Sequence, residues 1–153
     1  MKKLLSIIFC FGMLMSCEDS FVERCFSGEA NVVRKEVYMD SAITRLYVMS
    51  EAEVYLLYNE EQTIELEFPE NLIDDVEFRY EKGNLYITNT VTCKWRKENY
   101  APKLYLSLPS VKRFDIIDYT TVQCIDTIRH DQITFFSLGT GDLHLLTDVK
   151  NMR

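Results

Sequence analysis

Two short runs near the C-terminal end of the chain decide its fold: Asp118–Cys124, which reads DYTTVQC, and Gly139–Leu145, which reads GTGDLHL. Laid over one another, the runs are offset by 21 residues, from position 118 to position 139. At this offset apolar residues coincide in four pairs: Phe114 with Phe135, Ile117 with Leu138, Val122 with Leu143, and Cys124 with Leu145. A repeat of this length, built from short apolar strands with turn residues between them, is typical of a stacked β-coil. The repeat predicts an architecture and leaves ligand and reaction open.

The chain upstream of the repeat predicts short β-strands. Along Thr63–Phe68 apolar residues alternate with glutamates, so one face of this strand is expected to be buried and the other solvated. The other expected strands are Ile43–Met49, Val54–Tyr58, Val76–Tyr80, Leu85–Thr88 and Leu104–Leu108. Lys82–Asn84 contains a glycine and predicts a hairpin between the two strands that flank it. Pro69 is expected to end the strand before it, and Glu70–Asp75 is the single, short helix candidate.

Composition indicates one soluble, acidic domain. The chain has 153 residues, of which 47% are hydrophobic, enough for a real core and too many for a disordered chain. Its 24 acidic and 17 basic side chains give a net charge of −7. Such a surface repels nucleic-acid phosphates and anionic lipid, so we expect neither as a partner. We find no linker or low-complexity block that would divide the chain.

The N-terminal residues resemble the leader of an exported lipoprotein. Met1–Lys3 is positively charged, and Leu4–Met15 is almost wholly apolar but too short to span a bilayer comfortably. The run Leu14–Cys17 reads LMSC and resembles a bacterial lipobox, which implies diacylglycerol on the Cys17 sulfur and cleavage before it. Residues 1–16 are therefore predicted to be a signal peptide. An ordinary signal peptide or an uncleaved anchor is the alternative.

Residues 17–36 are interpreted as the lipidated cysteine, a tether and an edge strand, ahead of a domain at 37–153. Cleavage removes Lys2 and Lys3 and takes the net charge from −7 to −9. Glu18–Ser20 reads EDS and resembles the surface-export signal of some Gram-negative lipoproteins, although a solvated tether explains it equally well. Acyl chains hold a soluble domain on a membrane far better in pairs than singly, so the membrane is an expected partner, in the outer membrane on its periplasmic or outer side.

Five cysteines are present, and two of them are assigned to the leader region. Cys10 leaves with the signal peptide and Cys17 takes lipid. Cys124 occupies an apolar position of the repeat and is interpreted as a small core residue. Cys25 and Cys93 are then the candidate disulfide in an oxidising compartment. No Cys-x-x-Cys or Cys/His spacing indicates zinc or redox chemistry.

A basic and aromatic cluster lies in the expected loop from Cys93 to Pro102. Lys94–Lys97 reads KWRK, so Trp95 could stack against an anionic sugar or a partner; a solvated loop whose tryptophan covers one end of the core is the simpler explanation. A binding function predicts exposed aromatic side chains in a row. The first candidates for ligand contact are Trp95, Tyr105, Tyr86 and Tyr47.

The ordered set of motifs resembles a known family. These motifs are the strand at Ile43–Val48, AEVYL at Ala52–Leu56, GNLYI at Gly83–Ile87, LYLSLP at Leu104–Pro109, and FFSLGTGDLHL at Phe135–Leu145. Together they resemble the putative auto-transporter adhesin head GIN domain family of bacterial exported lipoproteins. The resemblance implies an all-β fold in which an antiparallel sheet leads into a short β-solenoid with rungs of about 21 residues. The family's activity is not established, and its name suggests adhesion.

The sequence departs from the family pattern in two places. The first rung reads Asp118-Tyr119 where a glycine–serine pair is usual. Members also continue with further glycine-rich rungs, whereas here one rung follows Asp118–Cys124. An uncapped solenoid end exposes backbone donors and apolar layers, so self-association through this open end is a hypothesis. A protein that stays monomeric at high concentration in analytical ultracentrifugation would count against it.

A search for catalytic residues finds no set, and we predict none. His130 and His144 are separate, and no Gly-x-Ser-x-Gly elbow or phosphate-cradling loop is present. Gly139–Asp142 lacks the spacing and the repetition of calcium-binding β-roll repeats, so no metal or cofactor is expected. The carboxylate pairs are interpreted as solvated charge rather than a glycosidase acid and base: Asp74 with Asp75, Glu60 with Glu61, and Glu51 with Glu53.

These features together predict an exported, membrane-anchored lipoprotein that serves as a non-enzymatic binding or adhesion module. Long rigid surfaces of repeated strands suit recognition, so a glycan or an envelope protein is the expected partner. A structural or assembly component of the cell envelope is the alternative. A carbohydrate-active enzyme is the third possibility, and it would require a deep pocket with converging carboxylates.

Overall fold

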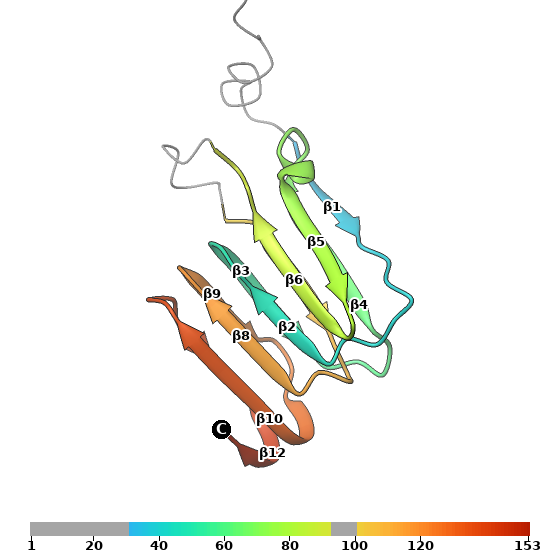
Figure 1. The fold of residues 1–153 in the computed structure, drawn as a ribbon, viewed down its shortest axis with the longest axis vertical. Coiled ribbons are helices and arrows are strands. Elements are labelled where there is room, and N and C mark those ends of the chain that lie inside the picture. The colour runs from blue at the N-terminus through green and yellow to red at the C-terminus, as the bar shows by residue number, and fades with distance from the viewer. Residues whose placement is uncertain (1–30, 93–100) are drawn as a thin grey trace, which may run out of the picture.

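The protein is a stack of two β-sheets, seen in a computed structural model that describes residues 31–92 and 101–153 (Figure 1). In that part of the chain each sheet has six strands. The first sheet runs, in spatial order, β1 (Val32–Glu36), β4 (Thr63–Pro69), β7 (Lys103–Ser107), β3 (Ala52–Leu57), β9 (Thr120–Cys124) and β11 (Leu143–His144). The second sheet runs β12 (Thr147–Met152), β10 (Ile128–Leu138), β8 (Arg113–Ile117), β2 (Arg45–Val48), β6 (Asn84–Asn89) and β5 (Val76–Glu81).

Both sheets are mixed. β1, β4 and β7 pair antiparallel at one edge of the first sheet, and β5 pairs antiparallel with β6 at the same side of the second. Among the described strands, all other pairings, from β6 and β7 onward, are parallel. The all-β class is confirmed, and the helix candidate shrinks to a 3₁₀ turn, η2 (Ile73–Asp75). The expectation of an antiparallel sheet that precedes a coil is corrected, because the antiparallel strands are the edges of the same two sheets.

The 21-residue repeat is confirmed, because residues 21 positions apart lie opposite each other on neighbouring strands. Phe114 lies opposite Phe135, Ile117 opposite Leu138, and Val122 opposite Leu143 in parallel pairs, while the fourth predicted pair falls beyond the end of β11. Each coil joins a strand of the second sheet to one of the first, but the coils do not stack in chain order. β2 and β3 lie between the β6–β7 coil and the β8–β9 coil. A regular solenoid winds consecutively, so a solenoid is not shown.

The core lies between the sheets and follows the period-two alternation. β4 alternates buried and half-buried positions from end to end, and β3 and β2 do the same. Leu46, Leu85, Leu104, Leu106 and Ile133 have no exposed surface. Burying a side chain of this size stabilises the fold by roughly 1.5–3 kcal/mol. Cys124 is buried within this core, as predicted.

Turn chemistry sets the strand ends. Lys82 and Gly83 both have positive φ, at 47° and 84°, and they form the predicted hairpin between β5 and β6. Asp118 also has positive φ, 71°, a region that aspartate tolerates better than most residues. This explains how the first rung accepts Asp118 in place of glycine. Gly139, one coil later, cannot change, because a Cβ there would collide with the Asp118 carbonyl oxygen.

Several predictions concern residues outside the described ranges and stay predictions. They are the signal peptide at 1–16, the lipid on Cys17, the disulfide between Cys25 and Cys93, and the contact role of Trp95. The domain boundaries at 17, 37 and 153 are likewise untested. Where the structure begins, β1 lies at the edge of the first sheet, as the entering strand was expected to do.

Candidate functional site

The outer face of the second sheet carries a row of aromatic and charged side chains across five strands. The alternation that buries leucine and valine between the sheets turns the intervening residues outward. Strand register then aligns one residue from each of β5, β6, β2, β8 and β10: Arg79, Tyr86, Tyr47, Asp115 and Phe136. Arg45 and Arg113, two residues before Tyr47 and Asp115, reach into the same row. We call these seven residues the tyrosine–arginine row.

The two tyrosines of this row stack face to face. The ring centroids of Tyr47 and Tyr86 are 4.5 Å apart with an interplanar angle of 10°. The guanidinium of Arg45 lies 4.5 Å from the Tyr47 centroid, and that of Arg79 lies 4.5 Å from the Tyr86 centroid. Since each ring already has the other on one face, the arginines cover the opposite faces. The rings therefore offer edges and hydroxyls to a ligand, rather than faces.

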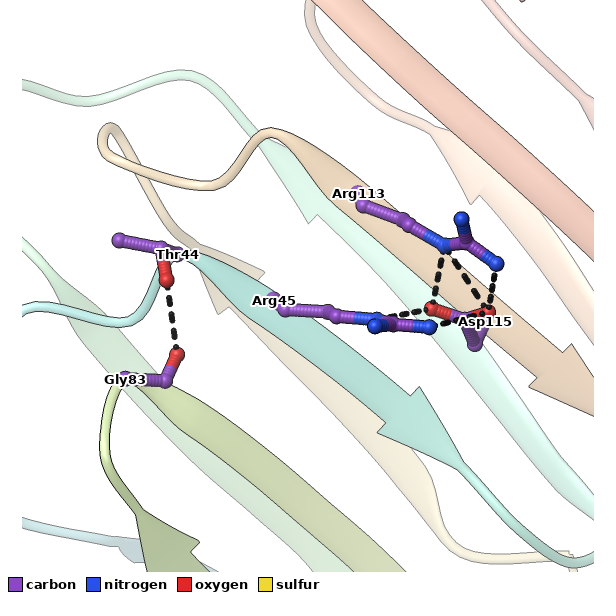
Figure 2. A network of polar contacts seen from close by, with 5 residues as sticks. All are labelled: Thr44, Arg45, Gly83, Arg113 and Asp115. Carbon is purple, nitrogen blue, oxygen red and sulfur yellow. Dashed lines mark hydrogen bonds and ion pairs between the residues drawn. The ribbon is translucent and has the colours of Figure 1, made fainter.

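Asp115 is the centre of the row (Figure 2). Its carboxylate accepts hydrogen bonds from Arg45 Nε at 2.6 Å and Nη2 at 3.1 Å, and from Arg113 Nε at 2.9 Å and Nη2 at 2.8 Å. The Asp115 side chain is only 5% exposed, against 34% for Arg45 and 40% for Arg113. Burial by itself would raise the pKa of Asp115, but the hydrogen bonds from Arg45 and Arg113 bring its pKa below the ordinary value. The group is thus a charged carboxylate at neutral pH.

Two guanidiniums share one carboxylate, so the centre of the row carries one excess positive charge. The hydrogen bond to Asp115 raises the pKa of Arg45 and of Arg113, which keeps both charged. Arg113 also lies over the Phe136 ring, 5.4 Å from its centroid. At the β5 end, Arg79 pairs with Glu81 at 3.6 Å, so this arginine adds no net charge. The excess charge is therefore localised on β2 and β8.

The outer face of the first sheet carries a second row of different charge. Tyr55 and Tyr105 stack with centroids 4.9 Å apart at 15°, and Arg34 covers Tyr105 at 3.7 Å. The neighbours are carboxylates: Glu67 accepts from Lys103 and from the Tyr105 hydroxyl, both at 3.3 Å. We name this the tyrosine–glutamate row, with these members: Arg34, Glu53, Tyr55, Glu65, Glu67, Lys103 and Tyr105.

Glu53 changes the chemistry of Tyr55 within this row. The Tyr55 hydroxyl donates to Glu53 Oε2 at 2.9 Å. That hydrogen bond, followed by burial and the charge of Glu53, raises the pKa of Tyr55 to about 12. In the other row, burial raises the pKa of Tyr47, and the positive charge of Arg45 opposes the shift.

The structure divides the predicted aromatic row between two faces. Tyr47 and Tyr86 lie together on the second sheet, but Tyr105 lies on the first sheet, beyond the core. The residues that sequence reasoning missed are Tyr55, Arg45, Asp115 and Arg113. Their signal was the i, i+2 spacing of polar residues on the strands at 45–48 and 113–117, which marks one outward face. The ion pair itself joins positions 70 residues apart and has no local signature.

The other titratable side chains include the two histidines and the predicted carboxylate pairs. Within residues 31–92 and 101–153 no group of three metal-ligating side chains converges. His144 is exposed, and His130 is half-buried, with burial lowering its pKa. His130 borders a small pocket between the ends of the two sheets, lined mainly by apolar residues. Glu51, Glu60, Glu61 and Asp74 are exposed.

The last described coil has inward positions that are open to solvent. Val122 is 1% exposed, yet Leu143, its in-register partner one coil later, is 41% exposed. Leu143 therefore extends the core layer beyond the part that both sheets cover.

A stack of two mixed sheets, with polar and aromatic outer faces, defines an all-β protein. The sequence profile of one family, described as "Putative auto-transporter adhesin, head GIN domain", matches residues 43–153, so the chain belongs to this family and the predicted resemblance is confirmed. An adhesin head points to an exported or cell-surface protein. No curated protein sequence matches the chain.

Solved structures share the fold. A putative adhesin from Bacteroides fragilis is 12% identical with a TM-score of 0.59, covering 78% of this chain and 61% of that one. A putative lipid binding protein from Parabacteroides distasonis is 17% identical with a TM-score of 0.61, covering 80% and 52%. A putative adhesin from Parabacteroides merdae is 12% identical with a TM-score of 0.57, covering 76% and 53%. The chain thus spans about half to three-fifths of the length of these relatives. At such identity the likeness concerns the fold alone.

Among residues 31–92 and 101–153 no helix has the length and apolar character that crossing a bilayer requires.

Proposed function

We propose that the protein is an exported lipoprotein whose all-β domain is a non-enzymatic binding or adhesion module of the bacterial cell envelope. The observation that carries this proposal is membership of the adhesin head family over residues 43–153, behind a leader that ends in LMSC at Leu14–Cys17. Acyl chains on Cys17 would hold the domain on the outer membrane, on its periplasmic side or at the cell surface.

Metabolic labelling with a fatty-acid analogue tests the anchor. The wild-type protein is expected to take up label, and Cys17→Ala is expected to abolish both the label and cleavage of the leader. Cys25→Ala is the matched control, since it removes a nearby thiol that the proposal leaves unlipidated. Label that persists in Cys17→Ala contradicts the anchor, and protease shaving of intact cells separates surface display from a periplasmic location.

A glycan array, probed with the full-length protein, tests the binding function. The two outer rows supply hydroxyls, guanidiniums and carboxylates on rigid strands, which is what a recognition surface needs. Saturable binding that is lost on unfolding is the expected result. Turnover of a glycan by the purified protein would instead favour the carbohydrate-active alternative.

A structural or assembly role in the envelope is the second candidate function. It is favoured by the exposed, inward-facing Leu143 of the last coil, which a second copy or an envelope protein would cover. Self-association through this surface predicts concentration-dependent dimers in analytical ultracentrifugation, which Leu143→Glu removes. Tyr38→Glu is the control because Tyr38 is also exposed but lies far from this coil in sequence. A wild-type protein that stays monomeric at every concentration contradicts self-association.

We also propose that the coils β8–β9 and β10–β11 begin a β-solenoid. The 21-residue register between them supports this, since both coils repeat the same path one layer apart. Cysteines introduced at Gln123 and His144, which are directly opposite, are expected to cross-link on oxidation. Thr121 with His144 is the offset control, and equal cross-linking of both pairs would contradict the register.

A further inference from the structure

The strongest unassigned feature is the centre of the tyrosine–arginine row. The chain has a net charge of −7, yet Arg45 and Arg113 meet on one outer face with a single carboxylate between them. We propose that this centre binds the carboxylate of an acidic sugar, a hexuronate unit of a polysaccharide chain lying across the strands. The inference rests on the proposed binding function and names its site and ligand class.

Free hydrogen-bond donors are available there. A guanidinium has five N–H donors. Arg45 and Arg113 each use Nε and Nη2 on Asp115, and no hydrogen bond from either Nη1 occurs within the described residues. Both side chains are partly exposed, at 34% and 40%. The remaining N–H groups can therefore reach a carboxylate from solvent, in the planar geometry that arginine prefers for this group.

Asp115 holds the two arginines in place and does not cancel their combined positive charge. At 5% exposure its carboxylate lies beneath the guanidiniums and is already saturated by them. It holds both arginines in place, so a ligand would not have to order two long side chains on binding. The buried negative charge compensates one guanidinium and leaves the other for an anion.

The covered ring faces favour an acidic sugar over nucleic acid. Binding of single-stranded nucleic acid depends on bases stacked against open aromatic faces, and the faces of Tyr47 and Tyr86 are taken by each other and by arginines. The arginines lie over these rings, and tyrosine hydroxyls suit the oxygen-rich edge of a sugar ring. Phe136, 42% exposed at the β10 end of the row, adds apolar surface next to Arg113.

Charge on the flanks confines the site to the strands β2, β8 and β10. Towards β5, Glu81 neutralises Arg79, and Glu77 adds a further carboxylate in register with Thr88. A polyanion would therefore be repelled from the β5 side and attracted to Arg45 and Arg113. The opposite outer face, with four glutamates against Arg34 and Lys103, would repel it altogether: Glu36, Glu53, Glu65 and Glu67.

Calorimetric titration of the full-length protein in detergent, with oligogalacturonate as probe, tests the site. Methyl-esterified oligogalacturonate is the matched neutral polymer. We expect binding of the acid form alone, weakened by added salt. Arg45→Gln and Arg113→Gln are each expected to weaken binding by about tenfold or more, since a charge-assisted hydrogen bond is lost. Tyr47→Phe, which keeps the stack and removes one hydroxyl, is expected to weaken it less.

Arg34→Gln is the control, because it removes the same charge from the opposite face, and it is expected to leave binding unchanged. Circular dichroism of each variant confirms folding, and Tyr47→Phe supplies a mild change if an arginine variant unfolds. Equal binding of the methyl ester, equal losses in Arg34→Gln, or tighter binding of oligodeoxythymidine would each overturn the inference. If the protein binds a neutral glycan but not oligogalacturonate, the proposed binding function is supported and the proposed acidic-sugar site is contradicted. If no glycan binds at all, both fall.

Discussion

The two outer faces of this protein share one geometry and differ in charge. Each carries a face-to-face tyrosine pair across parallel strands, Tyr47 with Tyr86 at 4.5 Å and Tyr55 with Tyr105 at 4.9 Å. Each pair is capped by an arginine. The stacking follows from parallel register, which places like residues side by side. The neighbouring outward positions then decide the chemistry: arginines around one buried aspartate on the second sheet, and glutamates on the first.

Removal of the central carboxylate of each row should give the largest difference in stability between the two faces. Asp115→Ala leaves two guanidiniums without their buried acceptor and is expected to lower the free energy of unfolding by about 1–3 kcal/mol. Glu67→Ala, on the first sheet, removes a more exposed partner and should cost less than about 1 kcal/mol. Urea unfolding measures both variants. Equal losses of unfolding free energy would mean that the two carboxylates contribute equally to stability.

The two tyrosine pairs should instead have equal coupling energies. Double-mutant cycles with tyrosine changed to leucine are expected to give a coupling of about 0.5–1.5 kcal/mol for Tyr47 with Tyr86, and the same for Tyr55 with Tyr105. The reason is that separation and interplanar angle are nearly equal in the two pairs. A coupling present in one pair and absent in the other would show that the flanking charges, and not the stacking, hold the rings.

Substitution of the arginines that cover Tyr105 and Tyr86 should change the free energy of unfolding by smaller amounts. Arg34 lies 3.7 Å from the Tyr105 centroid, and Arg34→Gln is expected to cost about 0.5–1 kcal/mol. Arg79 lies further from Tyr86, at 4.5 Å, and is more exposed, so Arg79→Gln should stay within about 0.5 kcal/mol. Thermal unfolding at low and high salt resolves the pair. A larger effect from Arg79 reverses this ranking.

The contribution of Tyr55 to the pH dependence of stability should appear only in alkali and be absent at neutral pH. The pKa of Tyr55 is raised from 10.0 to about 12, so the folded state keeps a proton that the unfolded chain releases. The stability due to Tyr55 is therefore complete below pH 10 and is lost as the pH rises from 10 towards 12. Tyr55→Phe should flatten this decline in unfolding experiments. Glu53→Gln should lower the pKa of Tyr55, and an unchanged phenolate titration would contradict the role of Glu53.

Local patterns predicted the strands well because alternation is a property of neighbouring residues. The strand at Thr63–Phe68 and the hairpin at Lys82–Asn84 both lie where the pattern put them. The 21-residue offset also predicted which residues of β8 and β10 face each other. The stacking order was not predictable in this way. Nothing local indicates that β2 inserts between β6 and β8, and without that order Tyr105 could not be separated from Tyr47 and Tyr86.

The sequence by itself determined that the chain folds as short β-strands with a 21-residue repeat, because side-chain periodicity and turn residues act over a few positions. It also determined the net charge and the family. Only the tertiary structure decided that Arg45 meets Asp115 and Arg113 on one outer face, while Glu67 lies on the other. Such contacts depend on which strands become neighbours, and strand pairing between residues 70 apart is set by packing of the whole core rather than by any segment of it.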